Sequence, residues 1–243
     1  MKADWQERTE LMFGADAVKR LAASRVAVVG LGGVGAMAAE MLVRAGVGRL
    51  VLVDTDTVSV SNLNRQLPAL HSTLGRLKTE VVSERLLDIN PSLEVLSINE
   101  FVSEENVSSL FEGLRLDYVI DCIDTLSPKI ALIRWCLGAG VPLVSSMGSG
   151  SKRDATRVRV DDISRTIQCP LARMVRKRLH PLGIREGFLA VYSTERPDHD
   201  SMVIEQSRNK KAQNGTVSYL PAVFGCVCAQ AAILHIVNNK DNS

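Results

Sequence analysis

Short apolar runs alternate with helical patterns over the first 150 residues of the chain. Val26 to Val29 is a β-branched run that ends in Gly30, and small and apolar residues with helical periodicity follow from Val34 to Ala45. A second apolar run, Leu50 to Val53, closes on Asp54 and completes a unit of about 30 residues. These patterns predict two parallel strands joined by a helix.

The alternation then continues to Gly150. We expect helices over Lys78–Ile89, Glu104–Phe111 and Lys129–Leu137, and strands over Glu94–Ile98, Tyr118–Ile120 and Leu143–Ser145. Ser103 is the expected cap of the second of these helices, and Gly138 with Gly140 marks the expected end of the third. Strands that alternate with helices predict an α/β fold, a doubly wound, Rossmann-like, mostly parallel sheet with helices on both faces. Functional residues are then expected at the carboxyl ends of the strands.

The pattern changes after Gly150. Arg157 to Val160 alternates charged and apolar side chains and Phe188 to Ser193 is a further apolar run, so we expect antiparallel strands in the C-terminal part. Glu195 to Gly215 is polar and predicts a long loop, either a binding segment or a disordered one. Pro221 to Val237 is apolar nearly throughout and predicts a final helix. We expect one domain over residues 1–243, with a core of about 24–150 and a substrate-binding extension of about 151–243.

The final apolar helix raises the question of a membrane. Its length is near the lower bound of about 17 residues for a span, but Gln230 and His235 interrupt it. We expect a buried core helix without stable membrane insertion, and a membrane association through this helix is the alternative. Met1 to Gln6 shows no secretory signal, and the five cysteines include no CxxC pair, which favours a cytoplasmic protein.

Composition limits the classes of partner. Hydrophobic residues make up 46% of the 243, which excludes a disordered chain, and a net charge of +2 provides no global field for a polyanion. Any nucleic-acid surface must therefore be local. Between Lys152 and Arg185 the chain has ten Lys and Arg but three acidic residues, a pattern that fits a phosphate-backbone footprint. The alternative is a solubilising basic helix face. The candidate nucleic-acid residues are Lys152, Arg153, Arg157, Arg173, Arg176, Lys177 and Arg178.

A glycine-rich loop lies between the first strand and the first helix of this pattern. Gly30, Gly32, Gly33 and Gly35 form the segment GLGGVG. Glycines allow a phosphate to approach bare backbone and to meet the N–H groups of a helix N-terminus. Asp54, about 24 residues further on, is placed to accept hydrogen bonds from ribose hydroxyls. The alternative is that the glycines serve only close helix packing.

Three further residues separate the classes of nucleotide chemistry. Arg65 and Lys78 place two cations near the phosphate edge, and Asp124 follows the fourth strand, where it can hold a divalent ion. Attack on the α-phosphate of ATP needs such charges, whereas hydride transfer does not. Taken singly, each residue also fits a surface ion pair, a solvated helix residue or a helix cap.

The chain resembles the adenylation domain shared by ubiquitin-activating enzymes and the bacterial molybdopterin-synthase and thiamine-pathway adenylyltransferases. The resemblance spans Trp5 to Gly150 and rests on GLGGVG, VDTD, SNLNRQ, GRLK and DCIDT. It implies a homodimer that binds ATP and Mg²⁺ and forms acyl adenylates. By this resemblance, ATP contacts the glycine loop, Asp54, Asp56, Asn62, Arg65, Gln66, Lys78 and Asp121, and Asp124 holds the metal. Arg8 matches an arginine that reaches the partner subunit's ATP site, so the implied catalytic set is Arg65, Lys78, Asp124 and Arg8.

The C-terminal half is similar to one branch of this superfamily. Ser145 to Leu179 and Ser218 to Ala229 resemble the tRNA threonylcarbamoyladenosine dehydratases, and the CxxC pairs usual in sulfur-carrier-activating relatives are absent. The resemblance implies that ATP activates the carboxylate of the threonylcarbamoyl group on adenosine 37 of tRNA. The side chain then closes into a cyclic form. A sulfur-transfer protein is left open as a further partner.

The cysteines do not require a covalent mechanism. Cys169 lies where ubiquitin-activating relatives place a thioester cysteine, but cyclisation needs no enzyme thiol because the nucleophile belongs to the substrate. We expect Cys169 to be structural, with a nucleophilic role as the alternative, and Cys122, Cys226 and Cys228 to lie in the core.

Three other functions stay open. The chain could adenylate the C-terminus of a ubiquitin-like sulfur-carrier protein, transfer hydride with NAD, or bind ATP without turnover as a sensor or scaffold. Pyrophosphate release would exclude the sensor or scaffold. Incubation of ATP with either tRNA or the carrier protein would separate the two adenylating enzymes.

Overall fold

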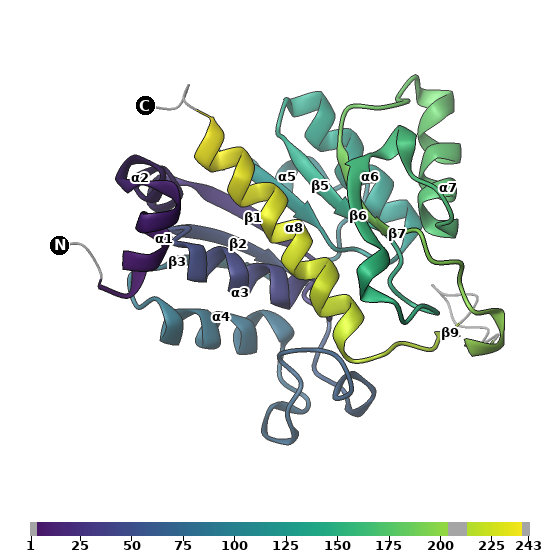
Figure 1. Cartoon of the computed structure of the whole chain (residues 1–243), viewed down its shortest axis with the longest axis horizontal. Coiled ribbons are helices and arrows are strands. Elements are labelled where there is room, and N and C mark those ends of the chain that lie inside the picture. Colours follow the sequence, from purple (N-terminus) through teal and green to yellow (C-terminus); the bar gives the residue numbers. More distant parts are fainter. Residues whose placement is uncertain (1–3, 204–212, 240–243) are drawn as a thin grey trace.

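The computed structural model describes residues 4–203 and 213–239, and a seven-stranded sheet lies at its centre (Figure 1). All neighbouring strands are parallel except β6 and β7. In spatial order the strands are β3 (Glu94–Ile98), β2 (Arg49–Val53), β1 (Arg25–Val29), β4 (Tyr118–Asp121), β5 (Leu143–Ser146), β7 (Leu189–Ser193) and β6 (Val158–Asp162). The predicted Rossmann-like, mostly parallel sheet with C-terminal antiparallel strands is confirmed.

Helices cover both faces of this sheet (Figure 1). One face packs against α2 (Ala15–Ala23), α3 (Gly35–Ala45), α4 (Lys78–Ile89) and α8 (Tyr219–Asn238), and the other against α5 (Val107–Leu110), α6 (Leu126–Ala139) and α7 (Pro170–Leu179). In β1, Val28 faces the first layer and Val29 the second, and both are buried. The central strands are apolar throughout because both of their faces are covered.

Several predicted boundaries are corrected by the structure. α5 is shorter than the expected helix over Glu104–Phe111, and Asn106 rather than Ser103 occupies the cap position. The backbone N–H of Ser103 donates to Asn106 Oδ1 at 2.7 Å, so this side chain organises a turn where the sequence pattern predicted helix. Gly140, with its left-handed φ of 68°, ends α6 as predicted, whereas Gly138 lies within the helix.

Two helices at the start of the chain were not predicted from the sequence. α1 (Glu7–Phe13) and α2 precede β1, and only Ala17 and Leu21 of the two are buried. Ala17 and Leu21 of α2 are four residues apart, so helical spacing was present in the sequence but was not recognised. In the C-terminal part, the expected loop over Glu195–Gly215 contains the short paired strands β8 (Met202–Val203) and β9 (Gln213–Asn214). The alternatives of a binding segment and a disordered one over Glu195–Gly215 stay predictions, and residues 204–212 of this segment lie outside the described residues.

The final helix α8 crosses the sheet beside α3 (Figure 1). It is long and apolar enough to cross a membrane by length and composition alone, but 56% of its most apolar window is buried inside the protein. Gly225 permits the close approach, because a Cβ at this position would collide with the Val34 carbonyl oxygen at the start of α3. These contacts support the core-helix prediction.

The cysteines of this region divide between the core and the surface. Cys228 is buried on α8 and Cys122 is half-buried at the end of β4. Cys226 is exposed, so its predicted place in the core was wrong: it lies on the outer face of α8. Cys169 is buried under α7, which fits a structural role.

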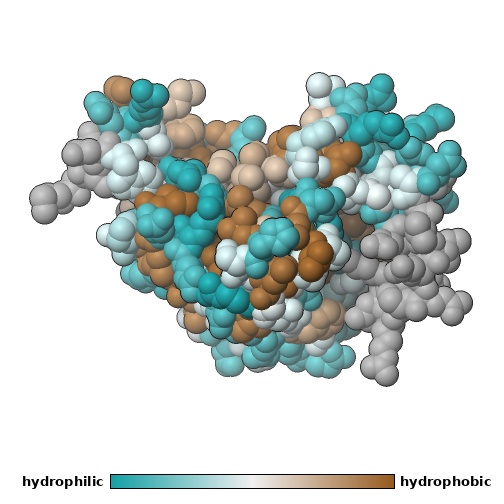
Figure 2. Space-filling model, turned by 90° about the horizontal axis from the view of Figure 1, so that it is seen from below, coloured by the Kyte–Doolittle hydropathy of each residue, from teal (hydrophilic) through white to brown (hydrophobic). Residues whose placement is uncertain are grey.

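The face that carries α4 and the loop after β2 also exposes apolar side chains. Figure 2 views this face and shows hydrophobic residues among hydrophilic ones. Val60, Leu70 and Leu87 are exposed in these segments. Apolar side chains scattered among polar ones in this way are an ordinary feature of a protein surface.

Candidate active site

The glycine loop joins the end of β1 to the start of α3. Gly30 has a φ of +90°, and a Cβ at Gly35 would collide with the Gly30 carbonyl oxygen. A Cβ at Gly33 would lie 2.9 Å from Pro221 Cβ. Packing within the protein therefore explains these three glycines. Gly32 differs, since a Cβ there would meet only the Gln66 side chain, at 3.7 Å, and the backbone at Gly32 is accessible to a ligand.

Asp54 braces this loop from the end of β2. Its Oδ2 accepts a hydrogen bond from the Leu31 N–H at 2.5 Å, and its Oδ1 accepts one from the Asp56 N–H at 2.8 Å. Burial raises the pKa of Asp54, although the Lys78 ammonium and the two amide donors oppose this shift. The carboxylate is thus fixed at the carboxyl edge of the sheet, where the sequence predicted a ribose-binding acid.

Lys78 and Asp56 form an ion pair next to Asp54. The Lys78 Nζ lies 2.7 Å from Asp56 Oδ2, and the Lys78 N–H donates to the Asp56 carbonyl at 3.0 Å. The lysine side chain is 5% exposed while the aspartate side chain is 68% exposed. The structure therefore brings the predicted cation and two predicted acids together, with the partner of the cation facing solvent.

The loop after β2 presents the remaining predicted ATP contacts. Arg65 folds back on this loop: its Nη1 donates to the Ser61 carbonyl and to Asn64 Oδ1. Asn62 is buried, and its Oδ1 caps the turn by accepting from the Ser59 N–H at 3.1 Å. Asn62 thus holds the loop in shape.

Gln66 is the residue of this loop that best fits a nucleotide contact. Its side chain lies beside Gly32, and its Oε1 is buried without a hydrogen-bond partner among the described residues. A buried acceptor without a donor is costly, and a hydroxyl or amine of a bound nucleotide would satisfy it.

Asp121 does not have its predicted role. It is 0% exposed, and its carboxylate accepts hydrogen bonds from Lys129 Nζ and Ser145 Oγ, both at 2.6 Å, and from the Ile123 N–H at 3.0 Å. Because both of its oxygens already accept hydrogen bonds inside the protein, Asp121 fits a supporting role and not a direct contact with ATP. Sequence reasoning missed Lys129, although a lysine at the start of an apolar helical run was a signal for a buried charge.

Asp124 lies in the four-residue turn between β4 and α6 and is exposed. This turn adjoins the glycine loop, because a Cβ on Gly30 would come within 2.9 Å of the Cys122 carbonyl oxygen. Among the described residues no three acidic, histidine or cysteine side chains gather into a metal cluster. A Mg²⁺ ion carried by nucleotide phosphates needs only one or two protein carboxylates, so Asp124 fits such a metal.

Arg8 lies away from the glycine loop of its own chain. It is exposed on α1, and the neighbouring Gln6 side chain packs against Gly46 at the far end of α3. Because α3 has 11 residues, about 16 Å of helix separates this position from Gly35. Arg8 therefore does not belong to the glycine-loop site of its own chain, and its contact with a partner subunit's ATP site stays a prediction.

The predicted nucleic-acid residues separate into buried and exposed ones. Lys152 is 4% exposed, donates to the Gly148 and Ser193 carbonyls at 3.2 and 3.5 Å, and has a pKa lowered by burial. Its predicted contact with nucleic acid was therefore wrong. Arg176 is half-buried and its Nη1 donates to the Ile163 carbonyl and to Thr166 Oγ1.

Five of the predicted basic residues remain on the surface. Arg153 and Arg157 form exposed ion pairs with Asp198 and Asp154. Arg173, Lys177 and Arg178 are exposed on α7 and have no ion pair within the described part of the chain. The start of α7 adjoins the loop after β5, since a Cβ on Gly148 would lie 3.8 Å from Leu171.

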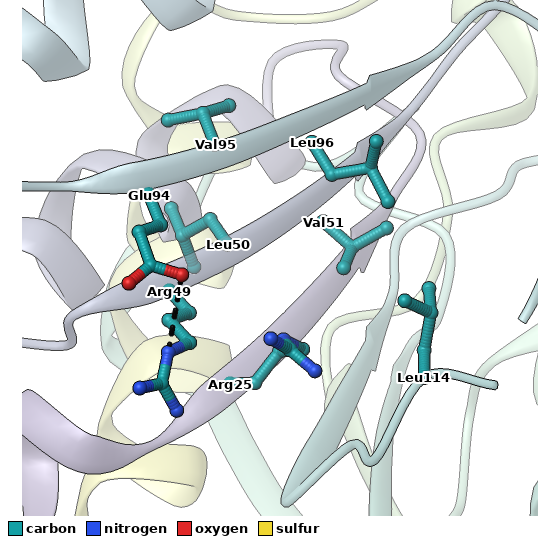
Figure 3. A pocket seen from close by; sticks show the side chains of 8 residues that line it. All are labelled: Arg25, Arg49, Leu50, Val51, Glu94, Val95, Leu96 and Leu114. Atoms are coloured by element: carbon teal, nitrogen blue, oxygen red, sulfur yellow. Dashed lines mark hydrogen bonds and ion pairs between the residues drawn. The ribbon is translucent and has the colours of Figure 1, made fainter.

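A small cavity of about 170 Å³ lies at the opposite edge of the sheet (Figure 3). Its walls include Arg25, Arg49, Leu96 and Leu114, and the Arg49 Nε pairs with Glu94 Oε2 at 3.2 Å. Arg25, Arg49 and Glu94 are the first residues of their strands. The cavity is therefore separate from the glycine loop at the carboxyl ends of the strands.

The glycine loop, Asp54 and the buried Lys78 lie together at the carboxyl edge of the sheet. This combination defines a nucleotide-binding α/β protein. The chain belongs to the ThiF family, whose model matches residues 6–243. It is 39% identical to the tRNA threonylcarbamoyladenosine dehydratase of Bacillus subtilis over 243 residues, which cover 96% of this chain and 94% of the relative.

A solved structure and a second kind of relative complete the comparison. The fold matches the crystal structure of the Escherichia coli tRNA N6-threonylcarbamoyladenosine dehydratase in complex with ATP, with a TM-score of 0.88, 35% identity, and coverage of 98% of this chain and 97% of that one. The molybdopterin-synthase adenylyltransferase of Salmonella typhimurium is 41% identical over 133 residues, or 55% of this chain and 53% of the relative. The predicted membership in the dehydratase branch is confirmed.

Proposed function

We propose that this chain is an ATP-dependent tRNA threonylcarbamoyladenosine dehydratase. The observation that carries the proposal is similarity to dehydratases over almost the whole chain, at 96% and 98% coverage. The NAD-dependent alternative lacks support, because the site gathers Lys78 and several carboxylates around the glycine loop.

The proposed reaction starts with ATP on the glycine loop. Asp54 accepts hydrogen bonds from the ribose, Gln66 offers its buried acceptor, and Lys78 and Arg65 offset the charge that builds on the α-phosphate. An oxygen of the threonylcarbamoyl carboxylate attacks the α-phosphorus and the bond to pyrophosphate breaks. An atom of the same side chain then attacks the acyl carbon, and AMP leaves with the former carboxylate oxygen. Proximity assists this step because both reacting atoms belong to one side chain.

Mg²⁺ is the metal that the site fits, held by Asp124 and the phosphates. When bound, it would supply positive charge to the leaving pyrophosphate. Lys78 can serve the same phosphates because its present partner, Asp56, faces solvent and can turn aside.

The exposed face of α7 is the proposed tRNA footprint. Arg173, Lys177 and Arg178 can contact phosphates without first breaking an ion pair within the described residues. This face begins next to the loop after β5, at the carboxyl edge that also holds the glycine loop. A tRNA backbone on α7 can thus deliver its modified base to the nucleotide site.

We also propose a cytoplasmic homodimer in which Arg8 completes the partner subunit's ATP site. The separation of Arg8 from the glycine loop of its own chain supports this arrangement. Exposed Leu11 and Met12 on α1 provide apolar area for contact between subunits. Burial of α8 against α3 supports a core helix in place of a membrane anchor.

A direct assay tests the function. Purified protein is incubated with ATP, Mg²⁺ and tRNA that carries threonylcarbamoyladenosine, and nucleosides are analysed by mass spectrometry. The proposal expects ATP-dependent loss of one water from the modified nucleoside together with pyrophosphate release. Pyrophosphate release with a sulfur-carrier protein, and none with the tRNA, would favour the adenylyltransferase alternative, which the partial match to the molybdopterin-synthase enzyme keeps open.

A further inference from the structure

A completely buried polar cluster lies behind the turn that carries Asp124. Lys129, on the first turn of α6, is 0% exposed, as are Asp121 at the end of β4 and Ser145 in β5. The Lys129 ammonium uses all three of its N–H groups: it donates to Asp121 Oδ2 at 2.6 Å and to Ser145 Oγ and the Ser146 carbonyl at 3.0 Å. Ser145 Oγ in turn donates to Asp121 Oδ2 at 2.6 Å.

A general stability role explains this cluster poorly. The desolvation cost of a buried ion pair offsets most of its Coulombic attraction, and apolar residues of similar volume are often equally stable in such places. Complete hydrogen bonding instead gives the cluster one arrangement. Its effect is therefore on the geometry of the elements that it joins.

The elements joined are the two ends of the Asp124 turn. Asp121 is the last residue of β4, the turn occupies residues 122–125, and Lys129 follows in α6. The Asp121–Lys129 pair closes the base of this turn, and the second carboxylate oxygen of Asp121 accepts from the Ile123 N–H inside it. The Lys129 N–H also donates to the Thr125 carbonyl at 3.4 Å. The two side chains thus tie the strand before the turn to the helix after it, and the backbone of α6 holds Thr125 at the second end of the turn.

The same turn also supports the glycine loop. The Cys122 N–H donates to the Val29 carbonyl at 2.8 Å, and Gly30 lies against the Cys122 carbonyl. A shift of the turn would move Asp124 relative to the loop on which the phosphates are proposed to lie.

We propose that Lys129 and Asp121 are positioning residues that hold Asp124 in the orientation needed for the metal of the nucleotide. The inference rests on the proposed function of the site. Neither side chain touches nucleotide, since both are completely buried, and each acts through the turn.

The test uses the paired substitution Asp121→Asn with Lys129→Met, which removes both charges together and leaves no unpaired buried ion. Asn keeps an oxygen that can accept from the Ile123 N–H. The matched control is Arg134→Met, which removes a cation from the same helix where it forms an exposed ion pair with Glu104. Binding of a non-hydrolysable ATP analogue is measured by calorimetry in Mg²⁺ and in EDTA, together with turnover and thermal unfolding.

The paired variant is expected to remain folded and to bind the analogue in EDTA as the unmodified protein does. Its half-saturating Mg²⁺ concentration should rise by about 10–100-fold, the usual effect of losing a residue that orients a metal ligand, and its turnover should fall. Arg134→Met should match the unmodified protein. A folded paired variant with unchanged Mg²⁺ dependence of analogue binding overturns the proposal.

A milder substitution covers the case in which the paired variant does not fold. Ser145→Ala removes one hydrogen bond from each of Lys129 and Asp121 and is expected to raise the Mg²⁺ requirement by several-fold, at a cost of about 1–3 kcal/mol in the free energy of unfolding. Unchanged Mg²⁺ dependence in that variant overturns the inference, as does Mg²⁺-independent binding in the unmodified protein. If the unmodified protein binds Mg²⁺-ATP but makes no cyclic product, the proposed function fails while the binding measurements still decide the positioning role.

Discussion

The nucleotide edge and the C-terminal extension use their positive charges in opposite ways. Lys78 and Lys129 are almost completely buried, and each lies within 2.7 Å of an aspartate oxygen. Lys177 and Arg178 on α7 are exposed and make no ion pair in the described ranges. A buried cation is held at one position. This suits a single fixed partner, such as an α-phosphate or a buried carboxylate. An exposed cation can follow the many phosphates of a flexible polyanion.

Removal of the more deeply buried cation should have the largest effect. Lys129→Met leaves the Asp121 carboxylate buried and unpaired, which is expected to cost about 3–5 kcal/mol in the free energy of unfolding. Urea denaturation measures this loss, and most of it should return when Asp121→Asn is added. A loss below about 1 kcal/mol would place the pair among surface ion pairs and would remove the contrast between the two regions.

The second prediction concerns Lys78, whose partner Asp56 is exposed. Lys78→Ala should reduce ATP-dependent turnover by about 100–1,000-fold because a charge aimed at the α-phosphate is removed. Pyrophosphate release measures this change, and Lys19→Ala, at an exposed ion pair on α2, is the control. Turnover that stays within twofold of the unmodified protein would refute the adenylation assignment.

The third prediction tests the exposed cations. Charge reversal of Lys177 and Arg178 should weaken tRNA binding, and the slope of log affinity against log salt should fall by about one for each tRNA phosphate that the variant no longer neutralises. Binding is measured at several salt concentrations, with Lys19→Glu as the control. ATP binding should not change in these variants. An unaltered salt slope would leave α7 with a solubilising role only.

The smallest expected effect is the pH dependence contributed by Asp54. Burial raises its pKa in the folded protein above the ordinary aspartate value of 3.8, so the folded state binds this proton more tightly than the unfolded state. The stability from this group is complete below pH 3.8 and is lost as the pH rises through the folded pKa. We expect the free energy of unfolding of the unmodified protein to fall relative to that of Asp54→Asn as the pH rises through this range. Urea denaturation of both proteins at several pH values measures this difference. A difference that moves the other way would contradict burial as the dominant cause.

The contrast between the regions also explains what the sequence predicted well. The strands β1, β2 and β4 lie between two helical layers, so continuous apolar runs such as Val26 to Val29 marked them within one residue. The glycine loop and Asp54 were placed correctly because their spacing follows from strand, turn and helix. α1 buries none of its residues and gave no comparable signal, whereas the amphipathic spacing of α2 was present but was missed.

Burial of charged residues was the part that the sequence did not predict. Asp121 and Asp124 are the same residue type in one five-residue motif, yet one is 0% exposed and the other is exposed. Lys152 belongs to a basic segment but is buried, and it donates to the carbonyl of Ser193 at the end of β7. In each case the position depends on strands and helices distant in sequence, so local composition could not separate supporting charges from charges that meet a ligand.

The contact of α8 with the glycine loop has a consequence for how the protein matures. Pro221 lies against Gly33, and Gly225 against Val34. A segment that is synthesised long after the glycine loop therefore packs against that loop. A nascent chain that lacks α8 lacks this packing, so nucleotide capture should begin only after α8 has left the ribosome.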